Sequence, residues 1–217
     1  VFDQNGDLLV TTGERQSNET RNNAQTLDNG YGKVIRITTQ GDPGAANPFI
    51  GQIGALPEIY SYGHRNPQGL AIQPGTGAIW ISEMGPRGGD ELNIIQAGKN
   101  YGWPAISYGI EYAGQPVGEG ITVKAGMEQP VYYWDPIIAP SGITFYDSTV
   151  IPEWTNNLFI SSLAGKHIAR IILDGTKVVG EERLLTEEGQ RFRDITGGSD
   201  GAIYAVTDSG WLYRIGK

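Results

Sequence analysis

The sequence of 217 residues contains no cysteine, which excludes disulfide bonds, thiolate catalysis and cysteine-ligated metal centres. Its only two histidines are His64 and His167, and neither has a serine, a cysteine or the other histidine at metal or triad spacing. A cluster of histidine ligands is therefore excluded within the chain, and a serine–histidine–aspartate triad has only weak support.

Long apolar runs and basic clusters are also missing. No apolar run approaches the roughly 18–20 residues that a membrane span needs, and no segment has the pattern of a signal peptide. The 24 acidic residues outnumber the 16 basic ones and give a net charge of −8. We therefore expect no membrane span and no nucleic-acid partner. The absence of cysteine is compatible with a periplasmic or secreted protein.

The sequence also lacks an initiator methionine. It opens with VFDQNG, which is typical of the tail of one strand entering a turn. Because a natural protein seldom starts in the middle of a hairpin, we expect these residues to belong to a longer chain.

What the sequence does contain is glycine, with 32 residues, and a short pattern that recurs. Each copy is a turn residue followed by four to six apolar or β-branched residues and then Thr, Ser or Asp. The copies are NGDLLVTTGE at 5–14, TGAIWISEMG at 76–85, NNLFISSLAG at 156–165 and DGAIYAVTDSG at 200–210. Such repeats predict a β-propeller, and they favour it over the rival β-sandwich.

A second class of strand follows three of these copies, at 32–41, 168–175 and 211–217. The last two are expected to form hairpins with the strands before them. At about 40–50 residues per blade, the chain supplies roughly four blades. We therefore predict a single partial propeller domain over residues 1–217 with no substantial helix, and a closed six-bladed ring would need more chain on the N-terminal side.

Polar loops between the strands carry the candidate functional residues. Pro67 fixes the direction in which Arg65 and Asn66 project, although a surface turn explains the same pattern. EMGPRGGDELN at 83–93 combines free backbone carbonyls with carboxylates, the ligands that calcium prefers, but it is equally consistent with a glycine-rich turn.

Arg191 and Arg193 alternate on a probable strand, so they face the same side and could grip a polycarboxylate together. The alternative is two ordinary surface arginines paired with Glu187, Glu188 or Asp194. Lys166 lies in another loop after a strand, where a lone lysine is most often solvated.

The order of these segments resembles the soluble glucose/sorbosone dehydrogenase family, and its aldose sugar dehydrogenase branch in particular. The resemblance runs from Val1 to Lys217. It rests on Glu14 after a repeat strand, RNPQG at 65–69, GPRGGDELN at 85–93, GKNYGWP at 98–104, APSG at 139–142, Lys166, and GQRFRD at 189–194.

This resemblance implies a six-bladed β-propeller that uses pyrroloquinoline quinone (PQQ) and calcium. Arg65 would lie against the reacting quinone carbonyl, and Glu14 matches a carboxylate that orients the catalytic histidine. His64 is expected to be a bystander. The other implied contacts are Asn66, Met84, Tyr132, Lys166, Arg191 and Arg193 with PQQ, the carbonyls of Gly85 and Pro86 with the calcium beside it, and Glu91 and Tyr101 with a second, structural calcium.

The sequence departs from the family pattern in three respects. In the family, the histidine that acts as the catalytic base belongs to a segment just before the strand with which this sequence opens. That base would therefore lie outside these residues. Ile137 stands where the glucose dehydrogenase branch has a threonine. About two blades' worth of chain are also absent.

The resemblance implies a quinoprotein that oxidises the C1 hydroxyl of an aldose to a lactone and passes the electrons to an acceptor. Its expected partners are the sugar, that acceptor and the N-terminal part of the same protein. Two alternatives stay open. One is a calcium-stabilised propeller fragment without catalysis that binds carbohydrate or protein, and the other is a propeller lactonase.

Overall fold

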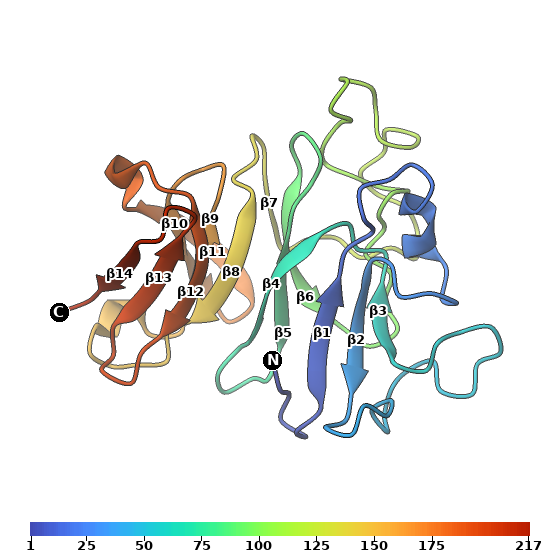
Figure 1. The fold of residues 1–217 in the computed structure, drawn as a ribbon, viewed down its shortest axis with the longest axis horizontal. Coiled ribbons are helices and arrows are strands. Elements are labelled where there is room, and N and C mark those ends of the chain that lie inside the picture. The colour runs from blue at the N-terminus through green and yellow to red at the C-terminus, as the bar shows by residue number, and fades with distance from the viewer.

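The computed structural model describes residues 1–217 as four antiparallel sheets that follow one another along the chain (Figure 1). In each sheet, strands that are consecutive in sequence are neighbours in space. The first sheet contains β1 (Leu8–Thr12), β2 (Lys33–Ile37) and β3 (Ile59–Tyr62). The second contains β4 (Pro67–Ile72), β5 (Ile79–Glu83), β6 (Asp90–Ile95) and β7 (Tyr132–Trp134).

The third and fourth sheets repeat this up-and-down order. The third contains β8 (Pro140–Phe145), β9 (Leu158–Ser162), β10 (Ile168–Asp174) and β11 (Lys177–Leu184). The fourth contains β12 (Phe192–Gly197), β13 (Ile203–Thr207) and β14 (Leu212–Ile215). The predicted all-β class is confirmed. The four sheets do not close into a ring, and the six-bladed total stays a prediction.

The four copies of the recurring sequence pattern form β1, β5, β9 and β13. The last three are the second strands of their sheets, whereas β1 is the first strand of its sheet. The turn before each copy needs a positive φ, which glycine adopts without strain. Gly6, Gly77 and Gly201 have φ of 83°, 72° and 76°, and Asn156 takes this position in the third copy with φ of 64°. The expected hairpins β9–β10 and β13–β14 are also present.

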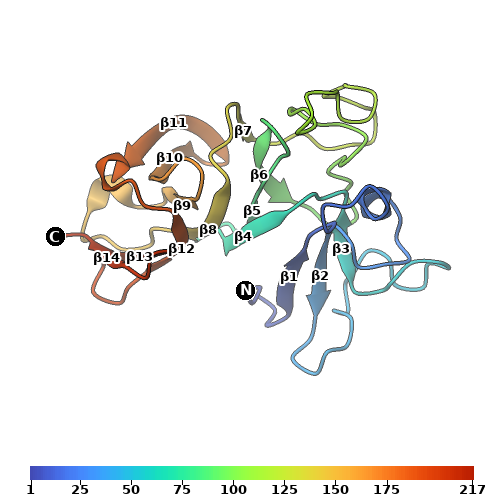
Figure 2. The same cartoon turned by 45° about the horizontal axis from the view of Figure 1, so that its top comes forward.

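Apolar residues pack between consecutive sheets rather than within one common centre. Leu9, Ile81 and Ile95 belong to a cluster between the first and second sheets. Trp80 and Ile160 belong to a larger cluster between the second and third, and a further cluster joins the third to the fourth. Each sheet therefore packs face to face against the next one, as Figure 2 shows.

β4, β8 and β12 are the first strands of the second, third and fourth sheets. They lie next to one another, and β1 lies beside β4. Residues of all four strands line one open cavity of about 500 Å³. The strands approach so closely that a Cβ on Gly69 would lie 2.4 Å from the carbonyl oxygen of Ser141, and one on Gly142 would lie 1.8 Å from Asp194 Oδ1. The backbone contact requires glycine at position 69, whereas a Cβ at position 142 would force the Asp194 side chain to move.

Helical structure is limited to three short 3₁₀ turns, Arg21–Gln25, Pro152–Trp154 and Thr186–Glu188. None of the helices is long and apolar enough to cross a membrane. The loops that carry the predicted site residues gather at one end of the sheets, where β1, β5 and β9 end and β4, β8 and β12 begin. We call this the site end.

Candidate functional site

Buried serines join equivalent positions of successive sheets at the site end. Ser82 Oγ donates to the carbonyl of Ser141 at 3.0 Å, and Ser141 Oγ donates to that of Phe192 at 2.8 Å. At the first sheet, the backbone N–H of Glu14 donates to the carbonyl of Arg65 at 2.9 Å. These bonds hold the loops of four sheets at fixed relative positions.

A polar pocket of about 500 Å³ opens between the first two sheets at this end and is lined by residues 11–16 and 65–68. Glu14, Arg65 and Asn66, all predicted from the sequence, therefore share one pocket. Gly13 allows the close approach, because a Cβ there would lie 3.3 Å from Asn66 Oδ1. Gln68 Nε2 donates to the same Asn66 oxygen at 2.8 Å.

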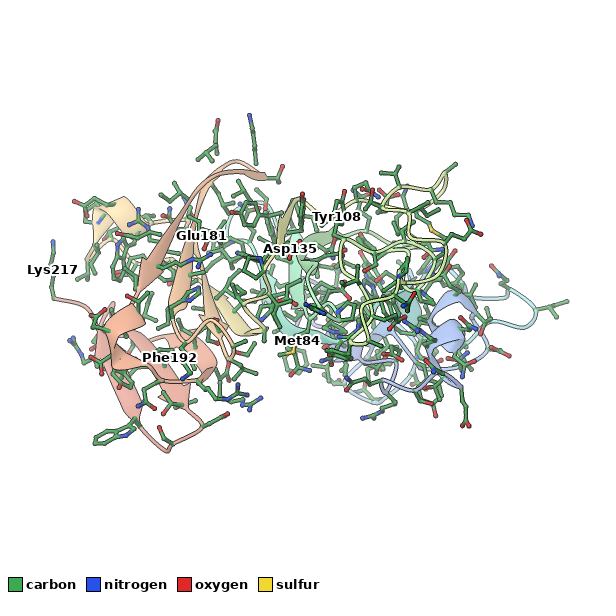
Figure 3. All side chains as sticks on the ribbon, turned by 90° about the horizontal axis from the view of Figure 1, so that it is seen from above. Met84, Tyr108, Asp135, Glu181, Phe192 and Lys217 are labelled. Atoms are coloured by element: carbon green, nitrogen blue, oxygen red, sulfur yellow. The ribbon has the colours of Figure 1, made fainter.

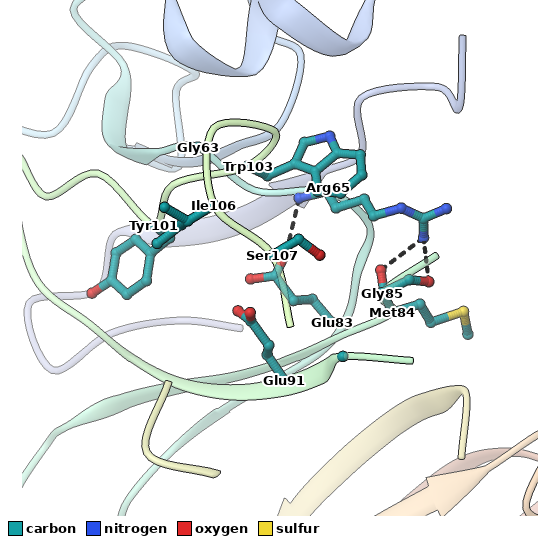
Figure 4. A pocket seen from close by; sticks show the side chains of 11 residues that line it. Gly63, Arg65, Glu83, Met84, Gly85, Glu91, Tyr101, Trp103, Ile106 and Ser107 are labelled. Carbon is teal, nitrogen blue, oxygen red and sulfur yellow. Dashed lines mark hydrogen bonds between the residues drawn. The ribbon is translucent and has the colours of Figure 1, made fainter. Parts of the chain in front are cut away.

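Arg65 is 6% exposed and its guanidinium is held in one orientation (Figure 4). Its Nη1 donates to the carbonyls of Met84 at 2.8 Å and Gly85 at 2.7 Å. Nη2 lies 3.3 Å from the hydroxyl of Tyr112, whereas Nε is buried and has no partner. A buried N–H donor without an acceptor is costly, so this unpaired group is an exception that needs an explanation.

Glu14 is 3% exposed, and its Oε2 is also buried without a partner. Burial raises the pKa of Glu14, and the nearby Arg65 opposes this by favouring the charged form. The pocket thus has one unpaired acceptor on Glu14 and one unpaired donor on Arg65. A hydroxyl group, which both donates and accepts, matches this pair.

His64, expected to be a bystander, lines neither the polar pocket nor the other cavities near Arg65, but it supports the Arg65 corner from the interior. It is fully buried and stacks on Tyr101 with ring centroids 4.8 Å apart. Its Nε2 lies 2.9 Å from Ser61 Oγ and its Nδ1 lies 3.2 Å from Glu83 Oε1. Glu83 Oε2 in turn accepts the backbone N–H of Arg65 at 2.8 Å.

This Ser61–His64–Glu83 chain resembles a catalytic triad in its order, yet Ser61 is also fully buried. No substrate can reach its hydroxyl, so a nucleophilic role for this serine is excluded. The chain instead fixes the backbone of the Arg65 corner. Sequence reasoning missed this chain, because Glu83 is 19 residues from His64 and only the β4–β5 pairing brings them together.

A second, small cavity of about 20 Å³ lies beneath Arg65, with room for one water-sized occupant (Figure 4). Glu83, Glu91 and Tyr101 are among its lining residues. Asn93 Nδ2 donates to Glu83 Oε1 at 3.0 Å and to Glu91 Oε2 at 3.1 Å, so the two carboxyl groups lie close together. Burial, reinforced by the charge on Glu83, raises the pKa of Glu91 to about 8.

The donor set at this cavity is suited to a hard cation. Tyr101 cannot bind one through its phenol, because that hydroxyl donates to the carbonyl of Ile94 at 2.6 Å and accepts the N–H of Gln96 at 2.9 Å. Its backbone carbonyl accepts no hydrogen bond and stays available. No cluster of three or more His, Cys, Asp or Glu side chains occurs, so any metal would rely on backbone oxygens.

The carbonyls of Gly85 and Pro86 differ in availability. That of Gly85 already accepts from Arg65, whereas that of Pro86 accepts no hydrogen bond. A Cβ on Gly85 would lie 2.4 Å from the carbonyl oxygens of both Gly88 and Gly89, so these backbone oxygens crowd together. Met84 lies beside them, and its Sδ accepts from Asn66 Nδ2 at 3.5 Å.

Arg191 and Arg193 do face the same side, and both bind one carboxylate. Arg191 Nε and Arg193 Nη2 each lie 2.8 Å from Asp208, which replaces the acids that the sequence suggested as partners. Arg191 Nη1 also reaches the carbonyl of Leu163 at 3.4 Å, at the start of the turn that carries Lys166. Lys166 is exposed, has φ of 53° and has no ion-pair or hydrogen-bond partner.

Tyr132 lies away from the polar pocket. Its hydroxyl donates to Glu181 Oε2 on β11 at 3.0 Å, and Trp134 Nε1 donates to the same oxygen at 2.9 Å. Tyr132 is therefore fixed between the last strands of the second and third sheets. Figure 3 shows Glu181 at some distance from Met84. A contact between Tyr132 and a cofactor stays a prediction.

Asp90, one of the carboxylates of 83–93 that the sequence offered as calcium ligands, instead connects the two groups of loops through backbone N–H groups. It is fully buried, with Oδ1 accepting the N–H of Gly85 at 2.8 Å. Oδ2 accepts the N–H groups of Ile138 at 2.8 Å and Ala139 at 2.6 Å. Burial raises the pKa of Asp90 to about 6, although the three N–H donors favour its charged form.

The turn that carries Lys166 is held by hydrogen bonds to the same segment, at Ile138. The carbonyl of Ile138 accepts the N–H groups of Ala164 and Gly165 at 3.0 and 2.9 Å, and Ser162 Oγ at 2.7 Å. One carboxylate therefore positions the Gly85–Pro86 carbonyls and, through Ile138, the turn that carries Lys166.

Comparisons with known proteins identify the family of the chain and its relatives. The family profile for glucose/sorbosone dehydrogenases matches residues 1–214. Aldose sugar dehydrogenase YliI of Escherichia coli K12 is 47% identical over 218 residues, which cover 99% of this chain and 58% of that protein. The chain thus spans a little over half of this relative.

Two solved structures extend the comparison. A crystal structure of a glucose dehydrogenase has a TM-score of 0.96 and 48% identity, covering 100% of this chain and 62% of that one. The PQQ-bound form of an aldose sugar dehydrogenase from Streptomyces coelicolor has a TM-score of 0.73 and 32% identity, covering 95% of this chain and 54% of that one.

Replacing Asp90 with alanine should destabilise the protein by about 3 kcal/mol or more, because three buried N–H groups lose their acceptor. Asp147→Ala is the matched control, since Asp147 is exposed and makes no hydrogen bond, and should change stability by less than about 0.5 kcal/mol. Urea unfolding measures both. Equal effects of the two substitutions would contradict the role given to Asp90.

Proposed function

Because the chain belongs to the glucose/sorbosone dehydrogenase family, we propose that it forms part of a quinoprotein that oxidises the C1 hydroxyl of aldose sugars to lactones. The observation that carries the proposal is the unpaired acceptor Glu14 Oε2 and the unpaired donor Arg65 Nε, both buried, on residues that line one polar pocket. The carboxylate, amide and guanidinium groups that line this pocket suit a sugar with several hydroxyl groups.

PQQ, when bound, supplies the hydride acceptor. Glu14 lies on the side of the pocket where the proton of the sugar hydroxyl is accepted. By resemblance, it orients the histidine base, which lies outside these residues. Arg65 is aligned by two carbonyls and two aromatic rings, so its charge is in place before the reaction starts. Such a preorganised cation stabilises negative charge that develops on an oxygen beside it.

The cations at the other side of the site end are suited to a cofactor with three carboxylates. Lys166, Arg191 and Arg193 provide three positive charges, and Asp208 offsets one of them. The free ammonium of Lys166 and the Arg191–Arg193 pair would hold PQQ by charge-assisted contacts. Asn66 and Met84, which touch each other, would complete its binding from the Arg65 side.

Two places are suited to calcium. The free carbonyl of Pro86, with that of Gly85, would hold an ion beside PQQ, where it would polarise the quinone as a Lewis acid. Glu91 and the free carbonyl of Tyr101 would hold a second ion in the small cavity. There the positive charge would relieve the repulsion between Glu91 and Glu83.

We further propose that residues outside this sequence complete a six-bladed ring. The first and last sheets have three strands where the two middle ones have four. On the last sheet, the cross-strand pair Val206 and Leu212 is 41% and 65% exposed, whereas the middle sheets are covered on both faces. The electron acceptor and a periplasmic or secreted location remain predictions.

The test is sugar oxidation by the full-length protein with PQQ, calcium and an artificial dye as acceptor. The wild type should oxidise aldoses, and Glu14→Gln should lower kcat by about 10²-fold or more, because the base loses its orienting charge. Glu19→Gln, which changes an exposed acid in the same loop, should match the wild type. A protein that oxidises no aldose under these conditions would refute the proposal, and the non-catalytic alternative would replace it.

Calcium should stabilise the protein more at pH 8 than at pH 5.5. Because the pKa of Glu91 is raised in the folded protein, protonation of its carboxyl group stabilises the calcium-free protein. This contribution to the free energy of unfolding is complete below about pH 4.5 and is lost as the pH rises through about 8. Calcium binds the charged carboxylate of Glu91, so the stabilisation that calcium provides grows over the same range of pH. Thermal unfolding with calcium and with chelator measures both trends.

Glu91→Gln should abolish the pH-dependent part of the calcium effect, while Glu119→Gln, an exposed acid, should retain it. A calcium effect that is the same at both pH values, or one that Glu91→Gln leaves unchanged, would place the ion elsewhere.

A further inference from the structure

Lys33, at the start of β2, is a fully buried lysine that forms no ion pair. Its ammonium donates instead to three backbone carbonyls, those of Asn23 at 2.9 Å, Ala24 at 3.2 Å and Tyr31. The three N–H donors therefore meet three acceptors, and no donor is left unpaired. Burial lowers the pKa of Lys33 to about 8, while the charge of Asp28 opposes this, so the side chain is still charged at pH 7.

A buried ammonium is an unfavourable way to fill space. Lysine is almost never fully buried without an acid as its partner, because its charge loses the surrounding water. An uncharged side chain of similar length would avoid that cost, but it would leave the carbonyl of Tyr31, which accepts no other hydrogen bond, without a donor. Potassium ions are held by the same kind of ligand, a group of backbone carbonyls. The ammonium of Lys33 thus occupies the place that a monovalent cation would take.

The three carbonyls belong to loop 13–32, which connects β1 to β2 and contains the 3₁₀ turn Arg21–Gln25, the blue helical turn in Figure 1. Thr12 closes this loop at its base, because its Oγ1 donates to the carbonyl of Gly30 and accepts the N–H of Lys33 at 3.1 Å. The ammonium therefore fills the interior of a closed loop, and the first residues of that loop line the polar pocket.

The same 3₁₀ turn supports the Arg65 corner. The carbonyl of Ala24, one of the three that hold the ammonium, also accepts the N–H of Gly63 at 2.9 Å. Gln25 Nε2 donates to the carbonyl of Trp103 at 2.6 Å, and the guanidinium carbon of Arg65 lies 5.3 Å from the centre of the Trp103 ring. A shift of the turn would therefore reach Arg65 both through the backbone before it and through the ring beside it.

We propose that Lys33 serves as a covalently attached monovalent cation that positions the polar pocket. Its ammonium holds loop 13–32 against the Arg65 corner and so fixes Glu14 relative to Arg65. Lys33 lines no cavity of the site and is a positioning residue. Its effect on sugar oxidation rests on the proposed function, whereas its effect on the order of the loop does not.

The experiment uses the full-length protein and three substitutions. Lys33→Ala removes the ammonium and leaves space among the carbonyls for a small cation, whereas Lys33→Met fills that space without a charge. Lys177→Ala removes an exposed lysine on β11 and is the matched control. Each protein is measured in ethylammonium chloride and, at the same ionic strength, in choline chloride, whose cation is bulkier and has no N–H donor.

The first readout is hydrogen exchange of the backbone amides, and the second is kcat/KM for glucose with PQQ, calcium and an artificial dye. In choline chloride, both Lys33 variants should exchange the amides of loop 13–32 about tenfold faster than the wild type, with the third and fourth sheets unchanged. Their kcat/KM should fall by about tenfold, because Glu14 and Arg65 lose their fixed relative position.

Ethylammonium should reverse at least half of both losses in Lys33→Ala and neither loss in Lys33→Met. Lys177→Ala should match the wild type in both salts. If Lys33→Ala folded only with ethylammonium, that result would support the role of the cation, whereas failure to fold in either salt would overturn it.

Faster exchange of equal size in all four sheets would also overturn the proposal, because Lys33 would then stabilise the fold as a whole. The same holds if ethylammonium restores nothing in Lys33→Ala, or if kcat/KM stays at the wild-type value while the loop exchanges faster. If the wild type oxidised no aldose, the proposed function would fail, and the exchange measurements alone would support or overturn the role of Lys33.

Discussion

The buried carboxylate of Asp90 is the interaction on which the geometry of the site depends. It accepts N–H groups from Gly85 in the second sheet and from Ile138 and Ala139 at the start of the third. Burying a carboxylate opposes its charged form, which is why its pKa is raised, and the three donors compensate for part of the lost hydration. The loops on both sides of the site therefore share one rigid support.

Glu83 has the corresponding role on the Arg65 side. Its two oxygens bind His64, Asn93 and the backbone of Arg65, so a residue deep in the second sheet determines where the guanidinium lies. Both acids occupy ends of paired strands, at Glu83 on β5 and Asp90 on β6. The sheet thus places the supports, and the loops carry the groups that meet ligands. Such an arrangement keeps the site ordered before anything binds.

The strands could be predicted from the sequence because turn chemistry and alternation are local. Each of the four repeat copies forms a strand, and the glycines before three of them have the positive φ that their turns require. The order of the polar loops along the sequence indicated Glu14, Arg65 and Asn66 as candidate site residues, and the structure places them in one pocket.

Long-range pairing could not be predicted in the same way. Nothing near His64 in sequence identifies Glu83 as its partner, and Arg191 and Arg193 bind Asp208 rather than the acids next to them. Tyr112 lies 47 residues from Arg65, within a long connection that has no regular pattern. These contacts depend on how the sheets pack, which periodicity does not specify.

The most direct test of the account is calorimetric titration of PQQ into the full-length protein with calcium present, repeated on Lys166→Ala and on Lys177→Ala. Lys166 lies free at the site end, whereas Lys177 is an exposed lysine at the start of β11. The account predicts binding of one PQQ per chain, weakened about tenfold or more in Lys166→Ala and unchanged in Lys177→Ala. Absence of PQQ binding, or equal affinity in all three proteins, would contradict it.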